Sequence, residues 1–422
     1  MVIEMLSTGD EVLQGDIVDT NAAWAGQQLA ECGLKFARRQ TIADDLSTLV
    51  SVLDECCRRA DWLLVNGGLG PTSDDLSAQA AAVLLDVPLE LNQFWLENLK
   101  RWYANKQREM PESNIKQAML PVGAELIDNP IGTACGFAIV HHDCQVLFTP
   151  GVPSEFKQML SQQWLPRLPK GDHAPIKRFF TFGLSESGVD QRLQQLVLPA
   201  GARLGFRAAR PSIEIKVFAP SALQSALREV HQQIRNILGT ELFSEDSGDW
   251  AALIQQLMLA KELKLACAES CSGGLLASQL IKVAGSSGYF ERGFVTYTNL
   301  AKQQMLGVSE SLLTHFGAVS VEVAQAMAQG ALAHSDADIA LSITGIAGPD
   351  GGSDEKPVGT VCFALATETQ CFSQCLQLTG RTRTAIRETA VATALDMLRR
   401  YLRQQPMWGE YDLIKRIREE QS

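Results

Sequence analysis

The sequence lacks a long apolar run and any metal-binding cysteine pair. Apolar segments such as residues 134–140 have the length of a strand, whereas a membrane span needs about 18 apolar residues or more. The first six residues have neither a basic start nor a long apolar stretch, so we expect no signal peptide. The ten cysteines are scattered, and none stands in a Cys-x-x-Cys pair. We therefore expect reduced thiols in a cytoplasmic protein, with no zinc site and no membrane partner.

An excess of positive charge is also missing. The 37 basic residues face 48 acidic ones, for a net charge of −11, so the chain as a whole repels polyanions. Its basic cluster comprises Arg399, Arg400, Arg403, Lys415, Arg416 and Arg418. Acidic residues such as Glu410 and Glu419 are interleaved with this cluster, which favours a solvated helical face. We therefore expect no nucleic-acid partner.

What is present is the composition of an ordinary globular chain. Apolar residues make up 46% and charged residues 20% of the 422 positions, and this length is typical of two or three domains. Strand-like and helix-like segments alternate, which predicts an α/β fold. We expect an N-terminal domain at 1–170, with a mostly parallel sheet and helices on both faces. A small α/β bridge at 171–247, a C-terminal α/β domain at 248–405 and a polar, loosely packed tail at 406–422 complete the prediction.

Periodicity and turn residues predict the main elements within these segments. Helices are expected at 20–32, 47–60, 74–85, 224–238, 251–261, 320–334 and 384–402. Strands are expected at 2–7, 62–65, 146–149, 178–182, 212–218, 265–268, 293–298 and 338–344, together with a hairpin of 360–366 and 371–378.

The sharpest chemical signal is a Gly-rich helix start that follows a strand, at residues 268–274. Ser270 stands where the strand ends, just before Ser272, Gly273 and Gly274. A hydroxyl in this position lies among free backbone N–H groups, which stabilise an oxyanion or hold a phosphate. Serine is also a favoured helix N-cap, so the peptide alone leaves a nucleophile and a simple cap both open.

A base for such a serine follows in the sequence. Tyr297 ends a strand, and Lys302 lies five residues on, in or beside the first turn of the next helix. A desolvated lysine or a tyrosinate activates a serine without histidine. Neither His315 nor His334 adjoins a glycine-rich turn, so a Ser-His-Asp triad is not favoured. Taken alone, Lys302 also fits a solvated lysine on a helix surface.

A second Gly-rich loop, residues 344–352, directly follows an apolar strand. Its four glycines allow the backbone to approach a ligand closely, and the carboxyl ends of strands are where open α/β sheets bind ligands. The alternative is a flexible hairpin loop.

Acidic residues follow two strands of the first domain. Asp10 and Glu11 come after the first strand, and Asp74 and Asp75 follow a Gly-rich stretch that begins at Gly67. Carboxylates that meet at the carboxyl ends of strands suit a divalent cation bound with substrate phosphates, while the amides of the glycine turn contact the anion. Alternatively, Asp74 and Asp75 simply favour a helix N-terminus.

Together these motifs resemble the CinA family of competence/damage-inducible proteins, whose N-terminal domain is similar to the molybdopterin-binding MoaB/Mog fold. In the first half, the resemblance lies in residues 9–15, 19–21, 67–75, 129–134 and 150–155. In the last segment, it lies in residues 268–274, 295–297, 301–302, 317–320, 344–352 and 356–360. The matches span nearly the whole chain.

The resemblance implies a nicotinamide-nucleotide amidase of NAD recycling. Such an enzyme hydrolyses nicotinamide mononucleotide to nicotinate mononucleotide and ammonia, without metal or organic cofactor. Ser270 matches the nucleophile, and Tyr297 and Lys302 match the groups that activate it. The substrate-binding residues that we predict are Glu269, Ser272, Gly273, Gly274, Thr344, Gly345 and Arg383. The oxyanion is expected at amides of residues 272–274. A guanidinium suits the nucleotide phosphate, and Arg381 and Arg387 lie close to Arg383 in the sequence.

In some relatives, as the resemblance implies, the N-terminal domain is a metal-dependent ADP-ribose pyrophosphatase. The site residues then expected are Asp10, Glu11, Gly67, Gly68, Asp74, Asp75 and Glu155, with Asp10, Asp74 and Asp75 as ligands of a divalent cation. The chain departs from the family pattern at Asn66, Ser77 and Cys135. A module that binds a pterin or nucleotide without turnover is the alternative for this domain. Relatives also suggest a homodimer.

Overall fold

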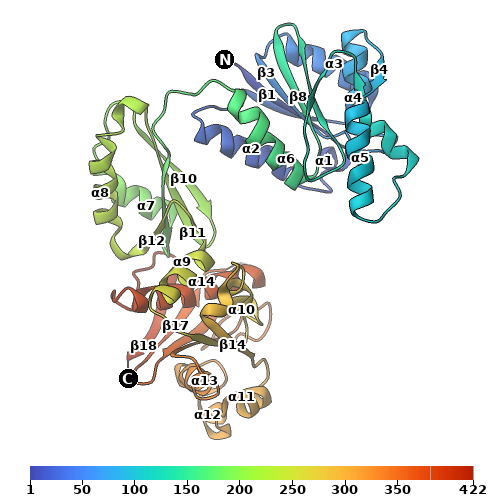
Figure 1. The fold of residues 1–422 in the computed structure, drawn as a ribbon. Helices are drawn as coiled ribbons and strands as arrows, with labels where there is room; N and C mark the ends of the chain where they lie inside the picture. The colour runs from blue at the N-terminus through green and yellow to red at the C-terminus, as the bar shows by residue number, and fades with distance from the viewer. Residues whose placement is uncertain (381, 422) are drawn as a thin grey trace. The chain divides into compact units, whose positions relative to one another are not determined.

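A computed structural model describes residues 1–380 and 382–421. The chain forms two compact units, Met1–His173 and Ala174–Ser422 (Figure 1). The first unit contains the predicted N-terminal domain, and the second contains both the predicted bridge and the C-terminal domain. Over the described residues, no helix has the length and apolar character needed to cross a membrane.

The first unit is built on a six-stranded sheet with the order β2-β1-β3-β8-β7-β6. The first four strands of this order are parallel, and β7 and β6 join antiparallel at one edge. The bounds are β1 (Ile3–Thr8), β2 (Arg38–Ile42), β3 (Trp62–Asn66), β6 (Glu125–Ile127), β7 (Gly136–His141) and β8 (Cys144–Thr149). A separate antiparallel pair is formed by β4 (Leu89–Leu91) and β5 (Met119–Pro121).

Helices cover both faces of this sheet (Figure 1). Successive residues of a strand point to opposite faces, so Met5 and Leu6 of β1 are buried in two different cores. On the Met5 side lie α2 (Thr20–Glu31) and α6 (Pro153–Met159). On the Leu6 side lie α3 (Leu46–Cys57), α4 (Ser77–Leu85) and α5 (Gln93–Asn105). The predicted α/β class, with helices on both faces of a parallel-rich sheet, is confirmed. A short helix, α1 (Asp10–Leu13), follows β1.

Local chemistry explains where two of these helices begin. The Asp19 carboxylate accepts a hydrogen bond from the Ala22 N–H at 2.8 Å, and this cap places the start of α2 where it was predicted. The helix expected from residue 74 instead begins at Ser77. The reason is that the Asp75 carboxylate accepts hydrogen bonds from the backbone and the hydroxyl of Thr72, which holds residues 72–75 in a turn.

The bridge forms an antiparallel sheet with the order β10-β11-β9-β12. Its strands are β9 (Lys177–Phe182), β10 (Arg203–Ala209), β11 (Ser212–Phe218) and β12 (Leu242–Glu245). One face packs under α7 (Glu186–Leu193) and α8 (Leu227–Leu238). The other face carries Phe180 and Phe182, which belong to the core of the C-terminal domain. The rings of Phe243 and Trp250 stack there at 3.9 Å, so the bridge and that domain share one core.

The C-terminal domain is a mixed sheet with the order β14-β13-β15-β16-β17-β18. The first three strands of this order are parallel and the others antiparallel, including the expected hairpin of β16 and β17. The strands are β13 (Leu265–Glu269), β14 (Phe290–Val295), β15 (Ile339–Gly345), β16 (Thr360–Ala366), β17 (Cys371–Leu378) and β18 (Ile414–Gln421). The helices are α9 (Trp250–Ala260), α10 (Leu275–Leu280), α11 (Asn299–Leu306), α12 (Glu310–Phe316), α13 (Val321–Ala333) and α14 (Arg383–Leu402).

Two expectations for the C-terminal end are corrected. The tail expected to pack loosely contains β18, which pairs with β17 as the edge strand of the sheet. Arg399 and Arg400, expected on a solvated face, are only 0% and 1% exposed. Both guanidinium groups bind the buried carboxylate of Asp396, and both also donate to the carbonyl oxygen of Thr240 in the bridge. Hydrogen bonding to these partners allows the charges to be buried.

Candidate active site

Ser270 lies directly after β13, the middle one of the three parallel strands, at their carboxyl ends. Its N–H donates to the carbonyl oxygen of Ile343 in β15 at 2.9 Å, and the residue is only 8% exposed. The chain then turns through Gly273 and Gly274, whose φ angles of 59° and 91° lie in the left-handed region that favours glycine. The Gly-rich start therefore forms a tight turn that leaves the hydroxyl of Ser270 on the wall of a cavity.

Lys302 of α11 is buried beside this hydroxyl. Its Nζ donates to Ser270 Oγ at 3.0 Å and to the carbonyl oxygen of Thr296 at 2.9 Å, and the residue is 1% exposed. It is therefore not a solvated helix lysine. Burial lowers the pKa of the Lys302 amine below its ordinary value of 10.5, because the charged form loses its hydration. A neutral amine so held is a base within reach of a serine proton.

The cavity that Ser270 and Lys302 line has a volume of about 270 Å³. Predicted residues on its wall also include Tyr297, Thr344, Gly345 and Arg383. Thr344 is held in place because its hydroxyl donates to the carbonyl oxygen of Ala318 at 2.7 Å. The structure thus brings the serine, the lysine and the second Gly-rich loop to one place.

Arg383 and Tyr297 form one rim of this cavity. Arg383, the first residue of α14, donates from Nη1 to the carbonyl oxygen of Gly348 at 2.7 Å and from Nη2 to the Tyr297 hydroxyl at 3.0 Å. Tyr297 is 59% exposed. Among the hydrogen bonds of the described chain, none joins its hydroxyl to Ser270 or Lys302. The phenol therefore faces the guanidinium rather than the serine that it was expected to activate.

The two arginines that lie close to Arg383 in the sequence, Arg381 and Arg387, are not found at the cavity among the described residues. Arg387 does not line the cavity, because its guanidinium donates to the carbonyl oxygen of Ser272 at 2.6 Å. Arg381 lies outside the described residues.

Four predicted substrate-binding residues lie in or next to the turn before α10 and do not line the cavity. Glu269 is fully buried, and its carboxylate accepts hydrogen bonds from the N–H groups of Gly274, Leu276 and Ala277 at 2.8–3.1 Å. The Gly273 N–H donates to the carbonyl oxygen of Ser270. Ser272, Gly273, Gly274 and Glu269 are absent from the described cavity wall. For two of the amides expected to hold the oxyanion there is a physical reason: the Gly274 N–H donates to the Glu269 carboxylate and the Gly273 N–H donates to the Ser270 carbonyl oxygen, so neither is free to do so.

The cavity wall also contains polar residues that were not among the predicted site residues. Cys271 adjoins the serine, Asn299 begins α11 and Asp350 lies in the second Gly-rich loop. In the sequence, the one signal that could have identified them was their position within or beside the motifs that contain Ser270, Lys302 and Thr344. Burial raises the pKa of the Cys271 thiol to about 11, so it stays protonated at neutral pH.

The first unit contains a larger cavity of about 510 Å³, where β1, β3 and β8 end. Of the residues predicted for this domain, its wall contains Glu11, Gly67, Gly68, Asp74, Asp75 and Glu155. Asp19 and Asp44 lie there as well, whereas no lysine or arginine lines the cavity in the described part of the chain. Burial raises the pKa of the Glu155 carboxyl, which also accepts a hydrogen bond from Asn129.

The predicted cation ligands are not gathered around one point. Asp10 does not line the cavity that Asp74 and Asp75 line, and Asp75 is held by Thr72. In residues 1–380 and 382–421, the trio that meets the distance requirement for one metal ion is a different one, discussed below. Residues at the ends of different strands thus share an edge of the sheet without converging, so the predicted trio does not fit a single ion.

Comparisons with known proteins cover nearly the whole sequence. A family model described as the CinA C-terminal domain matches residues 248–402, and one described as a probable molybdopterin binding domain matches residues 4–170. A CinA-like protein of Shewanella woodyi is 47% identical over 422 residues, which cover 99% of this chain and 100% of the relative. A Shewanella oneidensis protein named nicotinamide-nucleotide amidohydrolase PncC is 44% identical, again over 99% of this chain and 100% of the relative.

A solved structure also matches part of the chain. It is that of the competence/damage inducible protein CihA from Agrobacterium tumefaciens, with 46% sequence identity and a TM-score of 0.36. The match covers 37% of this chain and 98% of that chain.

Proposed function

Because the chain belongs to the CinA family, we propose that its C-terminal domain hydrolyses the carboxamide of a nicotinamide nucleotide, the activity that the name of the Shewanella oneidensis relative states for that protein. The substrate that we propose is nicotinamide mononucleotide, and the products are nicotinate mononucleotide and ammonia.

The observation that carries this proposal is the buried pair of Ser270 and Lys302. The 3.0 Å contact joins a hydroxyl to an amine whose pKa is lowered by burial. Both residues line the 270 Å³ cavity, whose volume is close to that of the smallest typical ligand pockets, about 300 Å³. In the reaction, Ser270 Oγ attacks the carboxamide carbon while neutral Lys302 takes its proton. Lys302 then gives that proton to the leaving ammonia, and water hydrolyses the acyl-enzyme with the same base.

The remaining wall residues have roles that follow from their chemistry. Cys271, the residue after the nucleophile, also lines the cavity, and we propose that its backbone N–H stabilises the developing oxyanion. The N–H groups of Gly273 and Gly274 already have hydrogen-bond acceptors within the turn. Arg383 presents a planar cation at the rim, which suits the phosphate of the nucleotide. The Tyr297 hydroxyl orients that guanidinium through the 3.0 Å contact.

Ammonia release from nicotinamide mononucleotide by the full-length protein tests the proposal directly. The expected result is stoichiometric ammonia and nicotinate mononucleotide without added metal, and much slower turnover of free nicotinamide, which lacks the phosphate. The absence of ammonia release from the mononucleotide would overturn the proposal.

The 510 Å³ cavity supports a second proposal, that the first unit binds a nucleotide or pterin. Its position fits this role, because open α/β sheets bind ligands beyond the carboxyl ends of their strands. The predicted cation trio does not fit one ion, so we propose binding without hydrolysis. ADP-ribose, a diphosphate, should bind more tightly when a divalent cation accompanies it, because the cation offsets the repulsion between the diphosphate and the acidic wall. Calorimetry and product analysis with ADP-ribose test this: affinity without product supports a binding module, and product formation contradicts it.

A further inference from the structure

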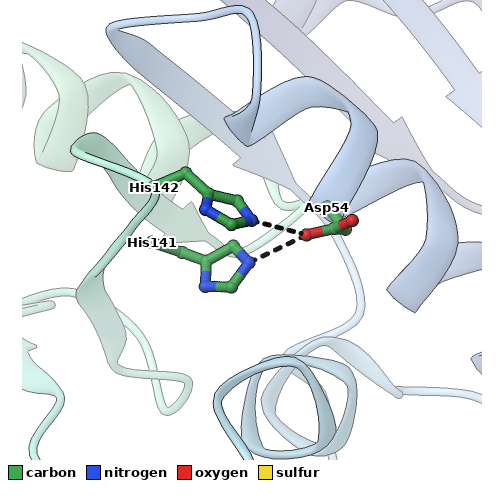
Figure 2. A group of neighbouring side chains, drawn as sticks. All are labelled: Asp54, His141 and His142. Atoms are coloured by element: carbon green, nitrogen blue, oxygen red, sulfur yellow. Dashed lines mark hydrogen bonds and ion pairs between the residues drawn. The ribbon is translucent and has the colours of Figure 1, made fainter.

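A group of two histidines and one aspartate lies in the first unit, apart from the 510 Å³ cavity of that unit. Asp54 lies near the end of α3, His141 ends β7, and His142 stands in the turn that joins β7 to β8. Figure 2 shows both imidazole rings directed at the carboxylate of Asp54. The Nε2 atoms of His141 and His142 lie 2.9 and 3.1 Å from the same oxygen, Oδ1.

The turn accounts for this convergence. Successive residues of a strand point to opposite faces, so two neighbouring histidines would ordinarily diverge. His142 and Asp143, however, have φ angles of 50° and 63°, the left-handed pair of a two-residue hairpin turn that usually takes asparagine and glycine. This backbone brings the ring of His142 to within 4.1 Å of the ring of His141, measured between centroids.

The carboxylate is oriented from its other side. Arg58, the C-cap residue that follows α3, donates from Nε to Asp54 Oδ2 at 2.9 Å. Oδ1 therefore faces the two imidazoles. A partner outside the ligand set that orients a ligand in this way is typical of metal sites.

The three ligand atoms lie within 4.8 Å of one another. In a tetrahedral site with metal–ligand bonds of about 2.0–2.2 Å, the ligand atoms lie about 3.3–3.6 Å apart. The Nε2–Oδ1 distances of 2.9 and 3.1 Å are slightly shorter than this, so small side-chain movements suffice to place one ion among the three side chains. The side chains are 31%, 19% and 40% exposed for Asp54, His141 and His142, which leaves them open to an ion from solution.

We propose that Asp54, His141 and His142 form a binding site for a divalent transition-metal ion, with Zn²⁺ as the representative. Two imidazoles and one carboxylate suit zinc and its neighbours, whereas Mg²⁺ and Ca²⁺ prefer oxygen ligands throughout. Three protein ligands leave a further coordination position for water.

The site is distinct from the cavity of the same unit. His141 and His142 precede Cys144, the first residue of β8, whereas the cavity lies beyond Thr149, its last residue. The two ends of this strand are roughly 16 Å apart. A bound ion would join α3 to the β7–β8 hairpin, so it stabilises the first unit rather than acting at either cavity.

Zinc titration of the full-length protein tests the proposal. After treatment with a chelator, the protein is titrated with Zn²⁺ in competition with a chromophoric chelator, and its thermal unfolding is recorded with and without Zn²⁺. We compare the wild type with His141→Gln and His142→Gln. Two controls remove similar groups elsewhere: His315→Gln replaces an exposed histidine of the second unit, and Asp74→Asn changes the acidic cavity.

The wild type and both controls should bind one Zn²⁺ per chain at this site and melt at a higher temperature with the ion. Each histidine variant should bind Zn²⁺ at least about tenfold more weakly than the wild type, because the loss of even a residue that only orients a metal ligand weakens binding by this factor. Each variant should also lose the rise in melting temperature that Zn²⁺ causes in the wild type. The proposal is overturned if the wild type binds no Zn²⁺. It is equally overturned if folded His142→Gln, confirmed by its melting curve without Zn²⁺, binds the ion as tightly as the wild type.

Discussion

Replacing the Ser270 hydroxyl separates its chemical role from its structural one. Ser270→Ala removes the acceptor of the 3.0 Å hydrogen bond from Lys302 Nζ, while the lysine keeps its second acceptor, the carbonyl oxygen of Thr296. One hydrogen bond of this kind contributes about 1 kcal/mol to stability. The fold should therefore survive with a slightly lower melting temperature.

The effect on the reaction should be far larger. Without the hydroxyl there is no acyl-enzyme route, and turnover of nicotinamide mononucleotide should fall by on the order of 10³ or more, equivalent to about 4 kcal/mol of barrier. The loss in rate therefore exceeds what the lost hydrogen bond explains.

A matched control is available in the neighbouring strand β15. Ser342 is fully buried, and its hydroxyl donates a single hydrogen bond, to the carbonyl oxygen of Ala324 at 2.6 Å. Ser342→Ala should destabilise the domain by a similar amount and keep nearly full turnover. Ammonia release at saturating substrate, measured beside thermal melts, compares the two variants. If Ser270→Ala retains more than about a tenth of wild-type turnover, Ser270 is not the nucleophile.

Four further predictions follow from the same domain. The deamidase rate should rise with pH through a midpoint below 10.5, because the unprotonated Lys302 amine is the base and burial lowers its pKa. A pH–rate profile without this rise would contradict the role of Lys302 as the base. Arg383→Gln should raise KM for the mononucleotide about tenfold or more with a smaller effect on kcat, because a hydrogen bond between charged groups contributes about 1.5–3 kcal/mol to binding. Steady-state kinetics measure both constants, and an unchanged KM would show that Arg383 does not bind the phosphate. Asp396→Ala should cost about 3–5 kcal/mol in denaturant unfolding, because it leaves buried Arg399 without a carboxylate and buried Arg400 with only the 3.4 Å contact to Glu241. Asp336→Asn, at an exposed position, should change the unfolding free energy by no more than about 0.5 kcal/mol; equal effects would refute this. A fragment of residues 174–422 should melt higher than one of residues 248–422, which loses the ring of Phe243 from its core; equal melting temperatures would show that the shared core contributes little.

Much of the fold was predictable because its signals are local. Apolar periodicity located the strands that became β1, β3, β8 and β13, and the side chain of Asp19 marks the start of α2. The Gly-rich stretch after Ser270 correctly predicted that a helix follows the end of β13, although the structure places a tight turn between Ser270 and the first residue of α10. These features depend on the conformational preferences of a few neighbouring residues, which are the same in any protein.

The partners of charged groups were not predictable from local pattern. Glu269 was expected at the substrate but caps α10, and the interleaved charges near Arg399 and Arg400 indicated a solvated face although both arginines are buried against Asp396 and Thr240. Whether a charge is solvated or buried depends on elements distant in the sequence, and Thr240 lies 159 positions before Arg399.

The sequence alone determined the elements with a strong local pattern, such as β1, β3, β8, β13 and α2, and the residues able to carry chemistry. Only the tertiary structure decided which of those residues meet. It joined Ser270 to Lys302, 32 positions away, and placed Tyr297 against Arg383 instead. It also left Asp10 outside the cavity of Asp74 and Asp75, while bringing His141 and His142 to Asp54, a group that no sequence motif indicated. The physical reason is that strand and helix formation depends on short-range preferences, whereas the distance between two side chains depends on how sheets and helices pack.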